Sequence, residues 1–126
     1  GKESRDFVFI DDVVAATISG IESEASLVDV FNVGSGVAID VSTIANGLQR
    51  MLGQTVPVRV SGQFRMGDIR HSLADLTKVR ALLGFEPAVT MEEGLRRFVS
   101  WVIGEGVQAD WYEESLRELE TKGLLQ

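Results

Sequence analysis

Two arginines and an aspartate in one short segment are spaced so that they could bind an anion. They are Arg65, Asp68 and Arg70, in the run Arg-Met-Gly-Asp-Ile-Arg. Two guanidinium groups this close repel each other unless an anion lies between them, and a diphosphate suits the planar donor fork of arginine. The carboxylate of Asp68 could accept hydrogen bonds from a ribose or sugar hydroxyl. The alternative is a solvated loop whose charges pair locally, and residue type and spacing alone favour that alternative.

Four other polar residues have plain structural explanations beside a chemical one. Arg5 begins a hydrophobic run, where it is either the surface end of a strand or a phosphate ligand. Asp11 and Asp12 precede a helical pattern, so capping of that helix is the expected role and catalysis is not. His71, the single histidine, is expected to make a loop hydrogen bond rather than to act as an acid or base.

The standard catalytic and metal-binding residue sets are missing from the sequence. It has no cysteine, which excludes disulfides, thiolate nucleophiles and cysteine-ligated metals, and one histidine gives no histidine-rich metal spacing. The run Gly34-Ser35-Gly36 lacks the second half of either glycine-rich phosphate loop, so it predicts a turn that ends a strand. We therefore assign no catalytic residue and no metal site.

Composition indicates a single globular domain and excludes two classes of partner. The 126 residues are 44% hydrophobic and 25% charged, which is ordinary for a folded chain of this size. A net charge of -7 does not suit non-specific binding to nucleic acid, which needs a basic surface. No apolar run reaches the roughly 18 residues that cross a bilayer. We expect a cytoplasmic protein with neither a nucleic acid nor a membrane as partner.

Predicted strands and helices alternate along the chain, which indicates the α/β class. The strands are expected at residues 5–10, Val28–Val33 and Val56–Val60, with a short extended piece at Val37–Val41. The helices are expected from Asp11 or Asp12 to Ile21, from the cap Ser42 to Gly53, from Asp75 to Gly84, from the capping box Thr90–Glu93 onward and from Asp110 onward.

This set of elements predicts a portion of a larger fold. Val28–Val33 is almost uninterrupted in apolar character, which is typical of a strand buried on both faces of a parallel sheet. A few short strands do not make a closed sheet around it. The fold class is therefore α/β and partial, with few short strands and about five helices.

Three segments together resemble the C-terminal part of the NAD-dependent epimerase/dehydratase family, in the extended short-chain dehydrogenase/reductase superfamily, and within it members that resemble nucleotide-sugar 4-epimerases. The match covers residues 1 to roughly 104, in the family's order and at about its spacing. The segments are residues 5–16 (Arg-Asp-Phe-Val-Phe-Ile-Asp-Asp-Val-Val-Ala-Ala), residues 31–36 (Phe-Asn-Val-Gly-Ser-Gly) with the helix from Ser42, and residues 65–75 (Arg-Met-Gly-Asp-Ile-Arg-His-Ser-Leu-Ala-Asp) with Lys78, residues 81–87 and the Glu93-Gly94-Leu95 helix.

The resemblance implies roles for four residues. Arg5, Arg65 and Asp68 would hold the diphosphate and ribose of a nucleotide sugar, which reverses the preference stated above for Arg65. Ser72 would lie near the sugar ring, where side-chain size affects which substituent fits. The implied ligands are UDP- or dTDP-sugars, and the implied cofactor of the intact family is NAD.

The sequence departs from the family pattern in the residues that do the chemistry. The family's glycine-rich dinucleotide loop and its catalytic Tyr-x-x-x-Lys pair would precede Arg5, and Tyr112 is followed four residues later by Leu116 instead of lysine. We therefore expect residues 1–126 to be a single substrate-binding domain without its N-terminal Rossmann domain. It would bind no NAD alone and would not be catalytically competent, so whether it is an enzyme is left open.

Loss of the Rossmann half would also leave surfaces without neighbours. In the family, the strand matching Val28–Val33 lies in the Rossmann sheet, beside the helix that contains Val13–Ile21. We expect a homodimer or larger homo-oligomer formed through one of these two surfaces. The alternative function is a non-catalytic oligomeric interaction module derived from the same family.

Overall fold

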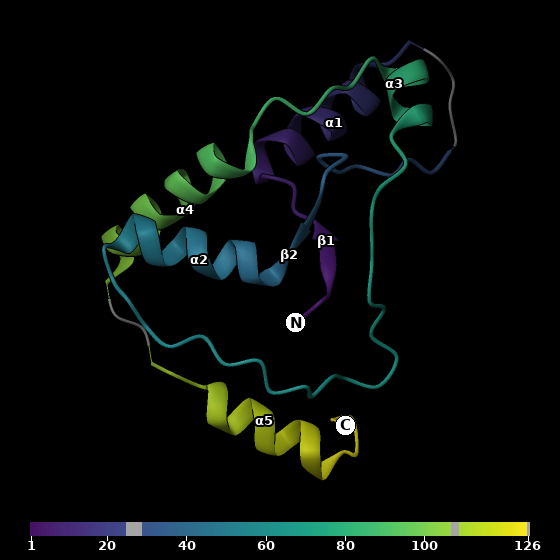
Figure 1. The fold of residues 1–126 in the computed structure, drawn as a ribbon. Helices are drawn as coiled ribbons and strands as arrows, with labels where there is room; N and C mark the ends of the chain where they lie inside the picture. Colours follow the sequence, from purple (N-terminus) through teal and green to yellow (C-terminus); the bar gives the residue numbers. More distant parts are fainter. Residues whose placement is uncertain (25–28, 107–108, 126) are drawn as a thin grey trace.

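The computed structural model describes residues 1–24, 29–106 and 109–125. In these ranges five helices accompany two short strands, which confirms the expected partial α/β fold (Figure 1). In chain order the elements are β1 (Ser4–Asp6), α1 (Ile10–Glu22), β2 (Ala38–Asp40), α2 (Val41–Leu52), α3 (Thr77–Leu83), α4 (Met91–Glu105) and α5 (Tyr112–Thr121).

Strand β1 lies between two segments that are distant in sequence. It pairs antiparallel with β2, with Arg5 opposite Ile39. On its other edge it forms a parallel bridge in which the Ser4 amide donates to the carbonyl of Arg70 (3.0 Å) and the Ser72 amide donates to the carbonyl of Ser4 (3.1 Å). The strand is shorter than the predicted 5–10, because the chain turns after Asp6 to begin α1 at Ile10.

Local signals in the sequence predicted three of the helix ends correctly. Thr90 caps α4 by accepting a hydrogen bond from the Glu93 amide, and Gly53 and Gly84 follow the last residues of α2 and α3. The cap of α2 is Asp40 and not the predicted Ser42: its carboxylate accepts from the Thr43 amide at 2.7 Å. The reason is that β2 runs directly into the helix, which leaves Asp40 as the last extended residue.

The predicted capping of α1 by Asp11 or Asp12 is wrong. The helix begins earlier, after Phe9, and that position makes no side-chain cap hydrogen bond. Asp12 is instead buried at 3% exposure and accepts hydrogen bonds from the amides of Ala88 and Val89 at 2.9 and 3.1 Å. The carboxylate of Asp12 therefore holds the segment between α3 and α4 against α1.

Two predicted strands are not formed. Residues 29–33 and 56–60 lie outside both strands of the described structure, and Val28 falls outside the described residues. Val30 is 82% exposed, and Val56, Val58 and Val60 are each more than half exposed. A strand needs a hydrogen-bonded neighbour, and no described segment of this chain pairs with either run.

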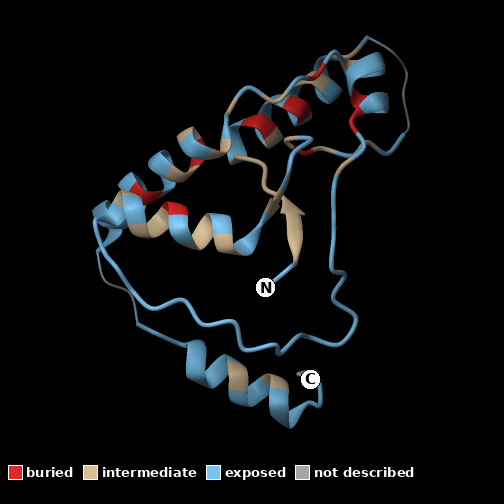
Figure 2. Cartoon of the chain, viewed as in Figure 1, coloured by how far each residue is buried: buried red, intermediate tan, exposed pale blue. Residues whose placement is uncertain are grey.

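The core is small and lies where α1 meets α3. Its buried members are Ala16, Leu76, Val79 and Phe85, with the half-buried Phe31 and Val33 among the residues packed around it. Figure 2 shows buried residues on α1 to α4 and none on α5. The segment that follows α5 is joined to the long segment between α2 and α3 by a backbone hydrogen bond from the Met66 amide to the Leu124 carbonyl.

One face of α1 is apolar and largely exposed among the described residues. Ile10, Val14, Ile18 and Ile21 recur at helical spacing and are 61%, 48%, 47% and 79% exposed. The opposite face, which carries Ala16, packs toward α3. The exposed residues are called the α1 stripe below.

None of the described helices is both long and apolar enough to cross a membrane.

Candidate functional site

The side chain of Arg5 is held against the loop that contains the other candidate residues. One guanidinium nitrogen donates to the carbonyls of Ser4 and Arg70, each at 2.9 Å, and the other donates to a carboxylate oxygen of Asp68 at 2.9 Å. The side chain is only 26% exposed. The structure thus brings together Arg5 and Asp68, which are 63 residues apart in sequence.

Arg65 lies on the same turn as Asp68. The Asp68 amide donates to the Arg65 carbonyl at 3.0 Å, and Gly67 has φ +83°, as the third position of a type II turn requires. The backbone of Arg65 bridges that of Leu125, which fastens the turn to the C-terminal segment. Arg65 is exposed, and within the described residues no hydrogen bond or ion pair engages its guanidinium.

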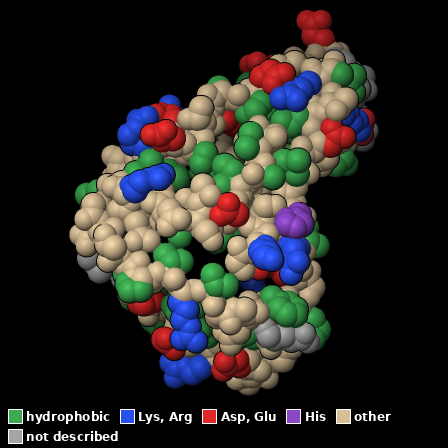
Figure 3. Space-filling model, in the orientation of Figure 1, with side chains coloured by type: hydrophobic (Ala, Val, Ile, Leu, Met, Phe, Trp, Pro, Cys, Tyr) green, Lys and Arg blue, Asp and Glu red, His purple; other side chains and the backbone are tan. Residues whose placement is uncertain are grey.

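Ser72 lies four residues beyond Asp68, and its amide donates to the carbonyl of Ser4. It lines a hollow of about 370 Å³ together with Asp6, Phe31, Asn32, Val33, Leu73 and Ala74. Its neighbour His71 makes the expected loop hydrogen bond, with Nδ1 2.8 Å from the hydroxyl of Ser4. Figure 3 shows basic side chains beside the histidine, although the chain as a whole carries a net charge of -7.

Asp6 links three separate segments, although the sequence pattern predicts no role for it. One oxygen of its carboxylate accepts from the amide and hydroxyl of Ser35, both at 2.6 Å. The other oxygen accepts from the amides of Gly36 (3.0 Å) and Ala74 (3.2 Å). The available signal was its place beside Arg5 in the first resembling segment, but its donors lie 29 to 68 residues away.

The hydrogen bonds to Asp6 stabilise its ionised form. Partial burial raises the pKa of this carboxyl, but the donors from Ser35, Gly36 and Ala74 outweigh burial and hold the pKa below its usual 3.8. The carboxylate is therefore ionised at neutral pH. Its contribution to stability is fully present above the unfolded-state pKa and is lost as the pH falls through the lower folded-state pKa.

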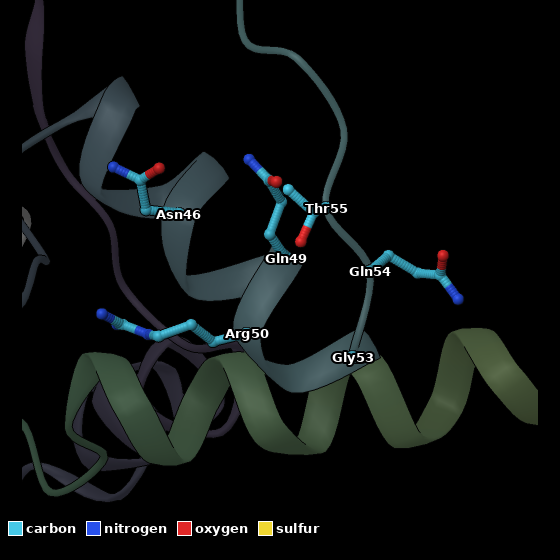
Figure 4. A pocket seen from close by; sticks show the side chains of 6 residues that line it. All are labelled: Asn46, Gln49, Arg50, Gly53, Gln54 and Thr55. Carbon is cyan, nitrogen blue, oxygen red and sulfur yellow. The ribbon is translucent and has the colours of Figure 1, made fainter.

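A larger hollow of about 420 Å³ lies at the end of α2, away from the candidate residues (Figure 4). Its side chains spread outward and do not converge on one point. The carboxamide oxygen of Gln49 accepts from the Val56 amide at 2.8 Å, which fastens the following segment to the helix. The lining residues are Asn46, Gln49, Arg50, Gly53, Gln54 and Thr55. This hollow offers no arrangement of groups for chemistry.

The arrangement around Arg5 is suited to binding rather than to reaction. It places a fixed guanidinium, a second arginine on the adjoining turn and a carboxylate within one region. Such groups recognise a phosphate-bearing ligand with hydroxyls. In the part of the chain that the structure describes, no group of three His, Cys, Asp or Glu side chains could hold a metal ion.

Known proteins similar to this chain are nucleotide-sugar epimerases and related enzymes. The dTDP-L-rhamnose 4-epimerase of Burkholderia thailandensis is 35% identical over 105 residues, which cover 83% of this chain and 29% of that protein. The UDP-glucose 4-epimerase of Thermotoga maritima, solved with UDP-glucose, aligns with a TM-score of 0.73 and 36% identity, over 83% of this chain and 33% of that one.

A third similar protein, MoeE5 in complex with UDP-glucuronic acid and NAD, aligns with a TM-score of 0.76 and 27% identity, over 84% of this chain and 35% of that one. No family model matches the sequence. The chain spans about a third of the length of these relatives. It is homologous to that portion of the NAD-dependent nucleotide-sugar 4-epimerases, which are extended short-chain dehydrogenase/reductases.

Proposed function

We propose that this chain is the nucleotide-sugar-binding portion of an NAD-dependent nucleotide-sugar 4-epimerase. In this proposal Arg5 and Arg65 bind the diphosphate, Asp68 the ribose, and Ser72 lies near the sugar ring. The observation that supports it best is the direct bond from Arg5 to Asp68, on the turn that carries Arg65. A homologous epimerase has been solved with UDP-glucose, which is the class of ligand proposed here.

The proposal includes no catalysis by these 126 residues alone. Hydride transfer needs a nicotinamide held by a Rossmann half, and acid–base catalysis needs a positioned side chain such as the family's tyrosine. Tyr112 does not fit this role, because it lies at the exposed start of α5 with Leu116 four residues later. We infer that NAD is the cofactor of the intact family and is not bound by this chain alone.

Titration calorimetry with UDP, dTDP, UDP-glucose and pyrophosphate tests the proposal. We expect saturable but weak binding, with a dissociation constant on the order of 1 mM, because the homologous region is only part of the relatives' length. Arg5→Ala and Arg65→Ala should each weaken UDP binding about 10-fold or more, since each removes a charge-assisted hydrogen-bond donor.

Arg80→Ala is the matched control for these variants. Arg80 lies on α3 and pairs with Glu86 at 3.0 Å, so the variant removes the same charge away from the site. UDP affinity should change less than about twofold, as for an exposed charge beyond the screening distance. Equal losses in all three variants would indicate non-specific attraction.

Saturable micromolar binding of NADH, followed by fluorescence, would contradict the absence of a cofactor site.

The alternative is a non-catalytic oligomeric interaction module, and the exposed α1 stripe favours it. Such a module would self-associate or bind another protein without any affinity for sugar nucleotides. The calorimetric series separates the two functions, because only the first predicts UDP binding that depends on Arg5 and Arg65.

Self-association is expected under either function. Residues 29–33 have no strand partner among the described residues, and the α1 stripe is apolar and exposed. Covering the α1 stripe removes apolar area from water, which stabilises the association by about 25 cal/mol per Å². We predict a homodimer or larger assembly through one of these surfaces, measurable by sedimentation equilibrium at high micromolar concentration. A monomer throughout that range would refute it.

Two substitutions on α1 identify the surface. Ile18→Glu places a charge in the stripe and should weaken the dimer about 10-fold or more if the stripe forms the interface. Ala15→Glu introduces the same charge at an exposed position outside the stripe and should leave the dimer intact. If both variants dimerise like the unmodified chain, the interface lies at residues 29–33 instead.

A further inference from the structure

We propose that Asp6 is a positioning residue, which orients Arg5 toward the diphosphate without contacting the ligand. This inference rests on the proposed function and adds a residue to its site. Three observations carry it: the way Asp6 extends the sheet, the tight space around its carboxylate, and the carbonyl that Arg5 shares with β1.

Asp6 takes the place of a backbone acceptor at the edge of β1. The parallel bridge is made by the bonds from Ser4 to Arg70 and from Ser72 to Ser4. In a regular parallel ladder the next amide, that of Ala74, would donate to the main-chain carbonyl of Asp6. It donates to the side-chain carboxylate instead. The carboxylate therefore fastens the segment after Ser72 to β1 where the ladder ends.

The same carboxylate fastens the turn that precedes β2. It accepts three hydrogen bonds from Ser35 and Gly36. The space is tight, because a Cβ on Gly34 would lie 2.3 Å from the Asp6 carboxylate and 2.7 Å from the Cβ of Ala74. The turn at residues 34–36 and the segment at residues 72–74 are thus held in one arrangement around this side chain.

Arg5 depends on that arrangement through a shared carbonyl. The carbonyl of Arg70 accepts from both the Ser4 amide and the Arg5 guanidinium. If residues 70–74 moved away from β1, Arg5 would lose this acceptor, and its bond to Asp68 on the same loop would be disturbed. The carboxylate of Asp6 is saturated by four donors, so its role is to hold the support of Arg5 in place.

Asp6→Asn tests the proposal, because the amide keeps the shape of the side chain but has only one acceptor oxygen. In nitrogen–proton NMR spectra of the unmodified chain, we expect the Arg5 guanidinium to give resolved, slowly exchanging signals. The variant should lose them, and its affinity for UDP should fall about 10-fold. Asp29→Asn is the control: it removes a carboxylate that pairs with Lys78, away from Arg5, and both readouts should stay unchanged.

A double variant separates positioning from general stability. If Asp6 acts through Arg5, then Asp6→Asn should weaken UDP binding about 10-fold in the chain that keeps Arg5. In the Arg5→Ala background the same substitution should weaken UDP binding less than about twofold. Equal losses in the two backgrounds would overturn the proposal, as would unchanged Arg5 signals in the single variant.

Two further outcomes are distinguishable. If Asp6→Asn fails to fold, Ser35→Ala takes its place: it removes one donor to the carboxylate, and it should broaden the Arg5 signals and weaken UDP binding to a smaller extent. If the unmodified chain binds no UDP, the proposed function fails, and the Arg5 signals still decide whether Asp6 orders this side chain.

Discussion

Gly34→Ala is expected to lower the free energy of unfolding by about 3 kcal/mol or more. The added Cβ would lie 2.3 Å from an oxygen of Asp6 and 2.7 Å from the Cβ of Ala74, far inside contact distance. Neither neighbour can move cheaply. The carboxylate is held by four hydrogen bonds, and Ala74 is tied to the same carboxylate through its own amide. Urea denaturation at neutral pH, followed by circular dichroism, measures the loss.

Gly104→Ala is the matched control for this substitution. Gly104 lies in α4, and a Cβ built there meets nothing within 4 Å. Alanine is the better helix former, so this variant should be as stable as the unmodified chain or more stable by up to about 1 kcal/mol. A loss at Gly34 no larger than about 1 kcal/mol would mean that the Asp6 region is loosely held, contrary to its hydrogen bonding.

Asp12→Ala is expected to destabilise the chain by about 2 to 3 kcal/mol. Asp12 is the buried charged residue of the described structure, and its two oxygens accept from the amides of Ala88 and Val89. Removing the carboxylate leaves both partly buried donors without acceptors, which costs more than the net value of the bonds themselves. The free energy of unfolding, measured in urea, reports the loss, and amide hydrogen exchange at residues 88 and 89 reports where it arises.

Two comparisons distinguish lost hydrogen bonds from lost volume. Asp12→Asn conserves the shape but turns an amide donor toward one of the two backbone donors, so it should destabilise the chain nearly as much as alanine does. Asp11→Ala removes the exposed neighbour, which pairs with Arg97 on the surface, and should cost less than about 1 kcal/mol. If Asp12→Asn were as stable as the unmodified chain, the hydrogen bonds would not be the cause.

The sequence alone predicted those features that depend on neighbours in the chain. Thr90 caps α4, because the hydroxyl of an extended residue just before a helix can reach the amide three residues later. Gly53 and Gly84 end their helices for an equally local reason, and the short strand β2 falls inside the predicted Val37–Val41. The resemblance to the epimerases also came from the order and spacing of motifs, and it is confirmed by the relatives.

Only the tertiary structure decided which segments meet. Apolar, β-prone residues at 29–33 and 56–60 predicted strands, but no described segment pairs with either. Asp12 had the local signature of a cap, and its real partners lie 76 and 77 residues further on. The sequence predicted no partner for Asp6 beyond its place beside Arg5 in the resembling segment, because its donors come from two other segments. A periodic pattern or a capping residue acts within a few positions, whereas strand pairing and buried carboxylates are satisfied by whatever the folded chain brings beside them.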